Sequence, residues 1–162
     1  MTFPDFVNLS AALTGFPAST LKPAQDTQLV AEDIYAELSK DTNNIPAAQL
    51  GLLSTQWLEI ADTPPADMEA KVKTEIIDNP AIARLAQNII LMWYLGNWYD
   101  LLKNPNCFIF PPDVPANHVN QDHVISSNVY KNSLVWGEML AHPMGYSTGI
   151  YGYWELDPSK QQ

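Results

Sequence analysis

The residues best suited to acid–base chemistry in this chain are His142 and Glu138. His142 stands in the run Ala-His-Pro-Met-Gly, and Glu138 lies one helical turn before it. A carboxylate in that position could orient the imidazole as a general base. No nucleophile motif or oxyanion-hole signature lies nearby in the sequence. The favoured interpretation is therefore structural, with His142 capping the last carbonyls of a helix or holding the loop that follows.

Two further histidines suggest a metal site. His118 and His123 are five residues apart, with Asp122 beside the second. Metal binding needs His, Cys, Asp or Glu side chains that converge at ligand spacing, and the other candidate ligands are not grouped with these. We therefore interpret both histidines as solvated loop residues and predict no metal site.

The glycines and aromatic residues near the C-terminus raise the question of nucleotide or sugar binding. These glycines do not form a GxGxxG pattern and no predicted strand precedes them, so the chain is not predicted to hold FAD, NAD or another cofactor itself. Tyr151, Tyr153 and Trp154 could stack on a sugar, which leaves a carbohydrate-binding module as an alternative. Burial against protein is nevertheless the commoner fate of such rings.

Composition favours a protein that hides surface in a complex. Charged residues make up 16% of the 162 residues, and the chain has five Trp and seven Tyr. Protein interfaces are depleted in Lys and Glu and enriched in aromatic residues. A neutral surface of Asn, Gln, Ser and Thr remains the alternative. The net charge of −10 and a single arginine, Arg84, argue against nucleic acid and anionic lipid as partners.

The lone cysteine, Cys107, lies in a loop-like stretch rich in Asn and Pro. One cysteine excludes an internal disulfide. Burial as a small hydrophobe is the favoured interpretation, and an intermolecular disulfide to a partner subunit is the alternative.

No targeting or membrane segment is predicted. Residues 1–15 lack the basic and continuous apolar regions of a signal peptide. The longest apolar stretch, residues 89–96, is far shorter than the roughly 20 residues that a membrane span requires, so we predict no direct span.

Apolar periodicity predicts one all-α domain over residues 1–162, with about six helices. Core helices occupy about residues 4–141, and an irregular aromatic tail occupies about residues 142–162. A long proline-rich connection spans about residues 104–121, and there is no strong strand signal. Five of the predicted helices cover about residues 4–14, 24–39, 47–61, 80–102 and 122–141. The remaining one, fourth in chain order, is expected to have Thr63 as its N-cap and Pro64 as its first residue.

Two of these helices carry specific expectations. In the second, Val30, Ile34 and Leu38 form an apolar stripe, and the acidic residues, including Glu37, are expected mostly outward in solvent. The fifth, which starts after the N-cap Asn79, is apolar nearly all round. Such a helix must be enclosed by the other helices or present one face to another subunit.

Three sequence stretches lead to a family resemblance. The first is FVNLS at 6–10 with LTG at 13–15, and the second is the apolar run 82–99. The third and most distinctive comprises Trp136, AHPMGY at 141–146, Gly149, YGYW at 151–154 and Pro158. Together they resemble the small (gamma) subunit of membrane-bound, FAD-dependent sugar and polyol dehydrogenases, which oxidise sorbitol, fructose, glucose or gluconate.

The resemblance implies a non-catalytic accessory chain. In that family a large subunit holds FAD, in some cases with an Fe–S cluster, and oxidises the sugar. A multihaem cytochrome c often joins the complex. The small chain supports maturation and export of the large one, so the expected location is the periplasmic face of the bacterial inner membrane. The family's usual twin-arginine signal is absent from this sequence, which has one arginine.

The same resemblance suggests which residues contact the large subunit. The aromatic tail and the proline-rich connection would clamp the flavoprotein. Cys107 is a candidate for a disulfide with that partner, a hypothesis in its own right because the family motifs do not cover the cysteine. The rival hypotheses are a small enzyme that uses His142 and Glu138, and the carbohydrate-binding module. The predicted interface residues are Cys107, Phe108, Phe110, Trp136, His142, Pro143, Tyr146, Tyr151, Tyr153 and Trp154.

Overall fold

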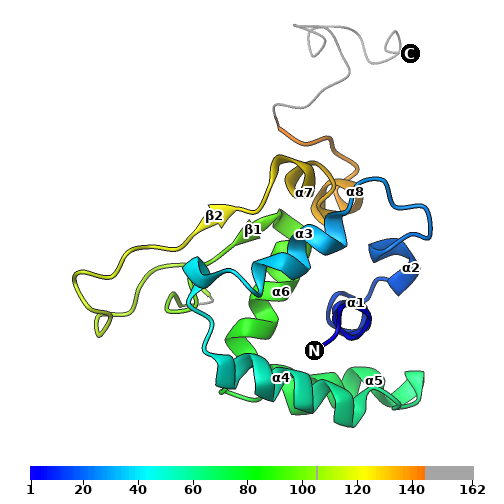
Figure 1. The fold of residues 1–162 in the computed structure, drawn as a ribbon, viewed down its shortest axis with the longest axis horizontal. Helices are drawn as coiled ribbons and strands as arrows, with labels where there is room; N and C mark the ends of the chain where they lie inside the picture. The colour runs from blue at the N-terminus through cyan, green and yellow to red at the C-terminus, as the bar shows by residue number, and fades with distance from the viewer. Residues whose placement is uncertain (105, 145–162) are drawn as a thin grey trace, which may run out of the picture.

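The protein is mainly α-helical, as the sequence predicts (Figure 1). A computed structural model describes residues 1–104 and 106–144. The helices are α1 (Phe3–Thr14), α2 (Ala18–Leu21), α3 (Val30–Glu37), α4 (Ala47–Ile60), α5 (Pro65–Val72), α6 (Ala83–Leu95), α7 (Ser127–Lys131) and α8 (Leu134–Glu138). A 3-10 turn η1 (Asp41–Asn43) and a π-helical turn η2 (Lys73–Ile77) join them.

Helix α1 is the centre of the core. Thr2 and Asp5 form a reciprocal capping box at its start, and Gly15 ends it in the left-handed region at φ 79°. Phe6 and Leu9 are fully buried, and α1 contacts α2, α3, α4, α5 and α6. Figure 1 shows α1 end-on, with the other helices arranged around it. The predicted helix over residues 4–14 is confirmed.

The second predicted helix, over residues 24–39, is wrong at its start. The Asp26 carboxylate accepts hydrogen bonds from the backbone N–H groups of Gln28 (2.8 Å) and Leu29 (3.0 Å). Leu29 then adopts a left-handed conformation at φ 56°, and α3 begins only at Val30. This local side-chain turn competes successfully with helix formation. The short helix α2 before it was not predicted.

Helices α4 and α5 form the lower edge of the view in Figure 1. Helix α4 matches its predicted range to within one residue. The predicted cap at Thr63 is wrong, because α5 begins at Pro65 after the N-cap Pro64, which makes no side-chain cap. Beyond Val72 the helix widens into the π-helical turn, which brings Ile76 into the core.

Helix α6 is shorter at both ends than the predicted range of residues 80–102. It starts at Ala83 and stops at Gly96, which is left-handed at φ 70°. The chain packs so closely there that a Cβ on Gly96 would lie 2.8 Å from the Tyr130 Cα. The inner face of α6 is fully buried, whereas Ile90 and Leu91 on the same helix stay partly exposed. The surrounding helices therefore enclose it on one side, leaving a half-exposed strip on the other.

A minimal antiparallel pair replaces the start of the sixth predicted helix. Strand β1 (Asn97–Trp98) pairs with β2 (His123–Val124), and Trp98 lies opposite His123. The predicted helix over residues 122–141 is thus wrong. This segment instead forms β2, α7 and α8. The Ser126 hydroxyl caps the start of α7, and Asn132 and Ser133 separate α7 from α8.

Residues 99–122, which we call the arm, run outward from β1 and return to β2. The arm projects from one side of the helical body (Figure 1). It contains turns and extended backbone, as its prolines predict. Within residues 1–104 and 106–144, no helix is long and apolar enough to cross a membrane.

Candidate functional site

The arm is attached to the body through a buried amide on α6. Asn88 is fully buried, and its side chain donates to the Tyr99 carbonyl (2.6 Å) and accepts from the Tyr99 N–H (3.1 Å). These two bonds satisfy both backbone groups of the first arm residue where no strand partner is available. The direction in which the arm leaves the body is therefore fixed from α6.

Two carboxylates join the outgoing and returning legs of the arm. The buried Asp100 carboxylate accepts from the Gln121 N–H (2.9 Å), and its own N–H donates to Asp122 (2.8 Å). Asp122 also forms an ion pair with the largely buried Lys103. We call this cluster of Asp100, Lys103 and Asp122 the root of the arm.

His118 and Arg84 both contact Asp100 of the root. The His118 Nε2 lies 2.7 Å from the Asp100 carboxylate, and only 19% of the histidine side chain is exposed. Arg84 of α6 donates to the Asp100 carbonyl (3.1 Å). Burial lowers the pKa of the Arg84 guanidinium, and the charges of Asp122 and Asp100 offset part of that effect. The single arginine thus supports internal structure.

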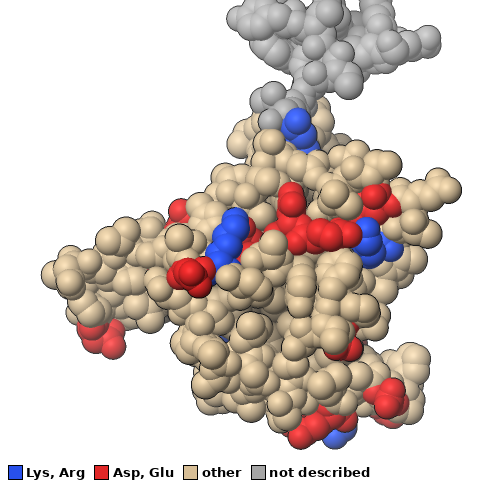
Figure 2. All heavy atoms as spheres, viewed as in Figure 1, with Lys and Arg blue, Asp and Glu red and all other residues tan. Residues whose placement is uncertain are grey.

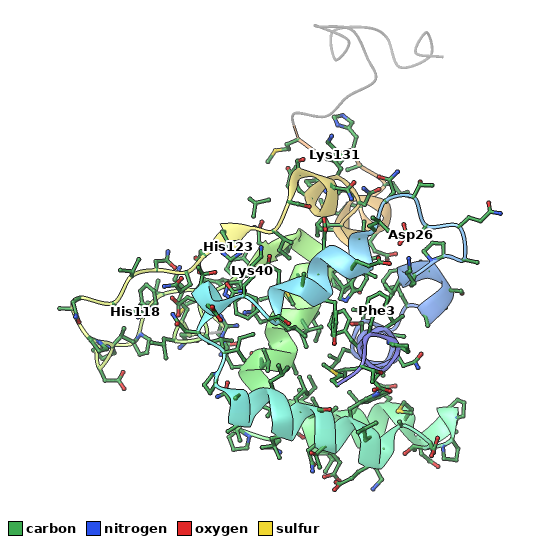
Figure 3. The ribbon with its side chains drawn as sticks, in the orientation of Figure 1. Phe3, Asp26, Lys40, His118, His123 and Lys131 are labelled. Atoms are coloured by element: carbon green, nitrogen blue, oxygen red, sulfur yellow. The ribbon has the colours of Figure 1, made fainter. Side chains whose placement is uncertain are left out.

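A second histidine attaches the returning leg to α3. His123 Nε2 lies 2.9 Å from Oε2 of Glu37, a residue 86 positions earlier that is fully buried. Glu37 also pairs with Lys40 and accepts from Asn43 Nδ2 (3.0 Å). One turn earlier on α3, Asp33 accepts from the Ser126 hydroxyl (3.0 Å). Figure 3 shows His123 beside Lys40 and His118 farther out along the arm.

The two buried carboxylates stay ionised at neutral pH. Burial alone would raise the pKa of Glu37, but hydrogen bonds from Lys40, Asn43 and His123 outweigh burial and hold it below its ordinary value. The same balance lowers the pKa of Asp100, where burial is outweighed by hydrogen bonds from the Leu102 N–H, His118 and the Gln121 N–H.

These findings correct two predictions. His118 and His123 are partly buried partners of carboxylates, so their interpretation as solvated loop residues is wrong. Glu37 was expected to face solvent and is fully buried, because the segment around His123 covers it. In residues 1–104 and 106–144 no group of three or more His, Cys, Asp or Glu could hold a metal ion.

The middle of the arm forms a tight turn that carries two predicted interface residues, Cys107 and Phe108. The Asn104 N–H donates to the Ile109 carbonyl (2.8 Å), and the Phe108 N–H donates to the Asn104 carbonyl (2.8 Å). Cys107 is an exposed free thiol, so the favoured interpretation of it as a buried small hydrophobe is wrong. Phe108 is left-handed at φ 54° and partly exposed, and its ring packs on Tyr99 at 4.9 Å.

Phe110, in contrast, is used within the arm. Its ring meets the His118 ring edge-on at 5.2 Å between centroids, and Lys103 Nζ lies 5.0 Å from its centroid. Between the arm turn and α6 lies a shallow cavity of about 200 Å³. Its lining residues are Arg84, Gln87, Ile90, Leu91, Asn106 and Phe108.

The end of the described chain holds the other predicted interface residues. Trp136 is half-buried: its Nε1–H donates to the Tyr130 carbonyl (2.7 Å), and its ring contacts the Tyr130 ring at 5.4 Å. His142 is exposed, with Nδ1 3.2 Å from the Pro143 carbonyl, and Pro143 is partly buried. Helix α8 ends at Glu138, so His142 does not lie at a helix terminus. Tyr146, Tyr151, Tyr153 and Trp154 lie outside the described residues.

Several apolar side chains are exposed that the sequence did not identify as surface residues. Ile109 and Val119 on the arm are 63% and 71% exposed. Met139, Leu140 and Met144 beyond α8 are 66%, 95% and 76% exposed. Their only sequence signal is apolar type in a segment without helical or strand periodicity, which does not distinguish a buried loop residue from an exposed one.

No family model matches this chain, and comparisons with curated proteins and with solved structures find no match.

Proposed function

We propose that this chain is a non-catalytic accessory small subunit of a heteromeric flavin-dependent sugar or polyol dehydrogenase. In this proposal the chain stabilises the large FAD-containing subunit and assists its maturation and export. It contributes no cofactor itself. FAD, and in some complexes an Fe–S cluster and haem c, belong to the partner subunits, including a multihaem cytochrome c. The complex would act at the periplasmic face of the bacterial inner membrane. The sequence resemblance supplies the identity of the partner.

One observation carries the proposal that the chain works in a complex. Among the described residues, large apolar side chains that are exposed lie beyond α6, with the exceptions of Leu29 and Leu58. They are Leu102, Phe108, Ile109, Val119, Val124, Met139, Leu140 and Met144. Exposed apolar side chains gathered in particular segments are typical of interaction sites.

The charge distribution supports contact through the arm. Between residues 104 and 121 the sequence holds one acidic residue, Asp113, and no Lys or Arg. Figure 2 shows the projecting arm as almost uncharged, whereas acidic and basic side chains gather across the middle of the body and along its lower edge. Charged residues are depleted at the centre of protein interfaces. The matching surface on the large subunit would therefore be a neutral, apolar groove.

Cys107 would strengthen this contact covalently. Its thiol is exposed at the turn of the arm, next to Phe108 and Ile109. In an oxidising compartment an exposed thiol inside an interface can pair with a cysteine of the partner. Non-reducing electrophoresis of the complex tests this step. A band of summed mass that disappears with reductant and in Cys107→Ser would support the disulfide, and its absence would remove the disulfide without affecting the rest of the proposal.

The decisive experiment is co-expression of a tagged copy with a large flavoprotein subunit of this dehydrogenase class, followed by pull-down. We expect a yellow complex that reduces a dye with a sugar or polyol, while the isolated chain is colourless and inactive. A well-behaved monomer that captures no flavoprotein would overturn the proposal. Tryptophan fluorescence that shifts when sugar is added to the isolated chain would favour the carbohydrate-binding module instead.

Matched variants locate the contact. Ile109→Asp places a charge on the arm, and Leu58→Asp places one on the similarly exposed Leu58 of α4. Both positions are exposed, so folding should tolerate both changes within about 0.5 kcal/mol. We expect capture to fall at least tenfold for Ile109→Asp and to stay unchanged for Leu58→Asp. Equal loss in both, or in neither, would contradict contact through the arm.

A further inference from the structure

His123 is held by acceptors at both of its ring nitrogens. Nδ1 lies 2.8 Å from the Gln121 carbonyl oxygen, and Nε2 lies 2.9 Å from Oε2 of Glu37. A carbonyl oxygen can only accept a hydrogen bond, and so can an ionised carboxylate. A neutral imidazole carries one N–H, whereas the imidazolium carries two. Both contacts can therefore be hydrogen bonds only when the His123 ring is doubly protonated.

Glu37 does not supply the missing proton. Its Oε1 faces the Lys40 ammonium group, and its Oε2 accepts from Asn43 as well as facing His123. These donors stabilise the ionised carboxylate in a fully buried position. Two other carboxylates near this segment bind other groups. Asp33 accepts from Ser126, and Asp122 pairs with Lys103 in the root of the arm.

His118 provides an internal comparison. The His118 ring forms a hydrogen bond through Nε2, with the Asp100 carboxylate as acceptor. A neutral ring with its hydrogen on Nε2 preserves that bond. Loss of a proton therefore has different consequences at the two histidines, although each pairs with a buried carboxylate at one end of the same segment.

The position of His123 decides what its protonation controls. It is the first residue of β2, opposite Trp98 of β1, and the arm returns to the body there. The side chain joins this point to α3 across 86 residues of sequence. A lost hydrogen bond at His123 would loosen the attachment of the returning leg to α3, while Asn88 still holds the outgoing leg and the root still joins the two legs.

We infer that His123 is a protonation-dependent latch between α3 and the returning leg of the arm. The imidazolium form binds Glu37 and the Gln121 carbonyl together and keeps the returning leg attached to α3. The neutral form keeps one of the two bonds, and the segment around β2 opens more often. This inference concerns the isolated chain and does not depend on the proposed partner.

The test follows ring protonation and arm opening in the same samples of the full-length, ¹⁵N-labelled chain. NMR reports the protonation of each histidine ring nitrogen across a pH series. Amide hydrogen exchange, corrected for its intrinsic pH dependence, reports opening of residues 119–125. We expect opening to increase about tenfold in step with loss of the His123 proton, the change that one charged hydrogen bond produces. Exchange in α1 should not follow that titration.

Two variants separate the histidines. In His123→Gln the side-chain amide donates to Glu37 without titrating, so the pH-dependent step in opening should disappear. In His118→Gln the step should remain. The inference is overturned if opening is unchanged while His123 titrates, if arm amides exchange at the unprotected rate throughout, or if His118→Gln abolishes the step. If His123→Gln does not fold, the wild-type titration still decides between these outcomes.

Discussion

The body, residues 1–98, and the C-terminal region, residues 99–144, are held together by different kinds of contact. The body buries a continuous apolar core, and Val129 is the one described residue beyond Trp98 whose apolar side chain joins that core as a fully buried member. In the C-terminal region Leu101, Ile125 and Leu134 pack partly buried against that core, and polar groups fix the arm to the body: Asn88, the root of the arm and the Glu37–His123 pair. The body therefore supplies most of the apolar core, and directional polar contacts hold the arm in place.

This difference has a physical consequence for stability and specificity. Apolar burial supplies most of the free energy of folding and has little directional preference. Hydrogen bonds and buried ion pairs add less net free energy but fix geometry, because an unpaired buried group is costly. The polar attachment therefore sets where the arm points while leaving its apolar side chains available.

The largest expected effect tests the apolar half of the comparison. Phe6→Ala removes a fully buried ring from the centre of α1 and should destabilise the fold by about 3–5 kcal/mol. Ile109→Ala on the exposed arm should change stability by less than about 0.5 kcal/mol. Denaturant unfolding followed by circular dichroism measures both. A comparable loss in Ile109→Ala would mean that the arm packs into a core, against the distinction drawn above.

The junction of the two regions should be the next most sensitive position. In Gly96→Ala the new Cβ would meet the Tyr130 backbone at 2.8 Å and would occupy a left-handed conformation, at a cost of about 2–4 kcal/mol. Gly15→Ala is the matched control, because Gly15 is also left-handed but has nothing within 4 Å of the added Cβ. We expect about 1–2 kcal/mol there. Equal unfolding midpoints for the two variants would contradict close packing at the junction.

Acid should weaken the polar attachment before it weakens the core. The pKa of Glu37 is lower in the folded protein, so its stabilising effect is present above the ordinary glutamate pKa of about 4.3 and is lost as pH falls through the lower folded value. Glu37→Gln should cost about 1–3 kcal/mol near neutral pH, and less as pH falls through that range. Urea unfolding at several pH values measures the difference. Glu69→Gln on exposed α5 is the control and should show no such trend.

The smallest effect is expected at the exposed end of the described chain. Leu140 is 95% exposed and left-handed at φ 50°, a conformation that asparagine tolerates better than leucine. Leu140→Asn should leave stability unchanged or raise it by up to about 1 kcal/mol, while weakening capture of the flavoprotein. Thermal unfolding and pull-down measure the two effects. Destabilisation together with unchanged capture would indicate that Leu140 packs within this chain.

Sequence reasoning succeeded where neighbouring residues decide the structure. The Phe6 and Leu9 stripe and the Gly15 stop, all within one segment, predicted α1, and the structure adds the Thr2–Asp5 cap at its start. Prolines between residues 104 and 121 correctly indicated an irregular connection. The errors at the starts of α3 and α6 come from short turns made by Asp26 and by the Asn79 side chain, which accepts from the Ala81 N–H (3.1 Å). Helix propensity does not capture such turns.

The predicted interface residues differ in their surroundings. Cys107, Phe108 and His142 are exposed, whereas Phe110 and Trp136 are partly buried and contact other residues of the chain. Apolar type alone cannot separate these outcomes, because each depends on whether a partner ring or carbonyl lies nearby in space. The Tyr130 carbonyl accepts the hydrogen bond of the Trp136 indole, and the His118 ring and Lys103 ammonium group contact the Phe110 ring.

By itself the sequence determined the class of fold, the apolar stripes of α1 and α4, the irregular arm and the scarcity of charge on it. These properties depend on residue type and on spacings of a few positions. The tertiary structure alone decided that Glu37 is buried, that His123 meets it and that Asp100 joins the two legs of the arm. Such contacts connect residues far apart in the chain, so no local pattern encodes them. Burial of a charged group is set by whichever distant donors the fold brings to it.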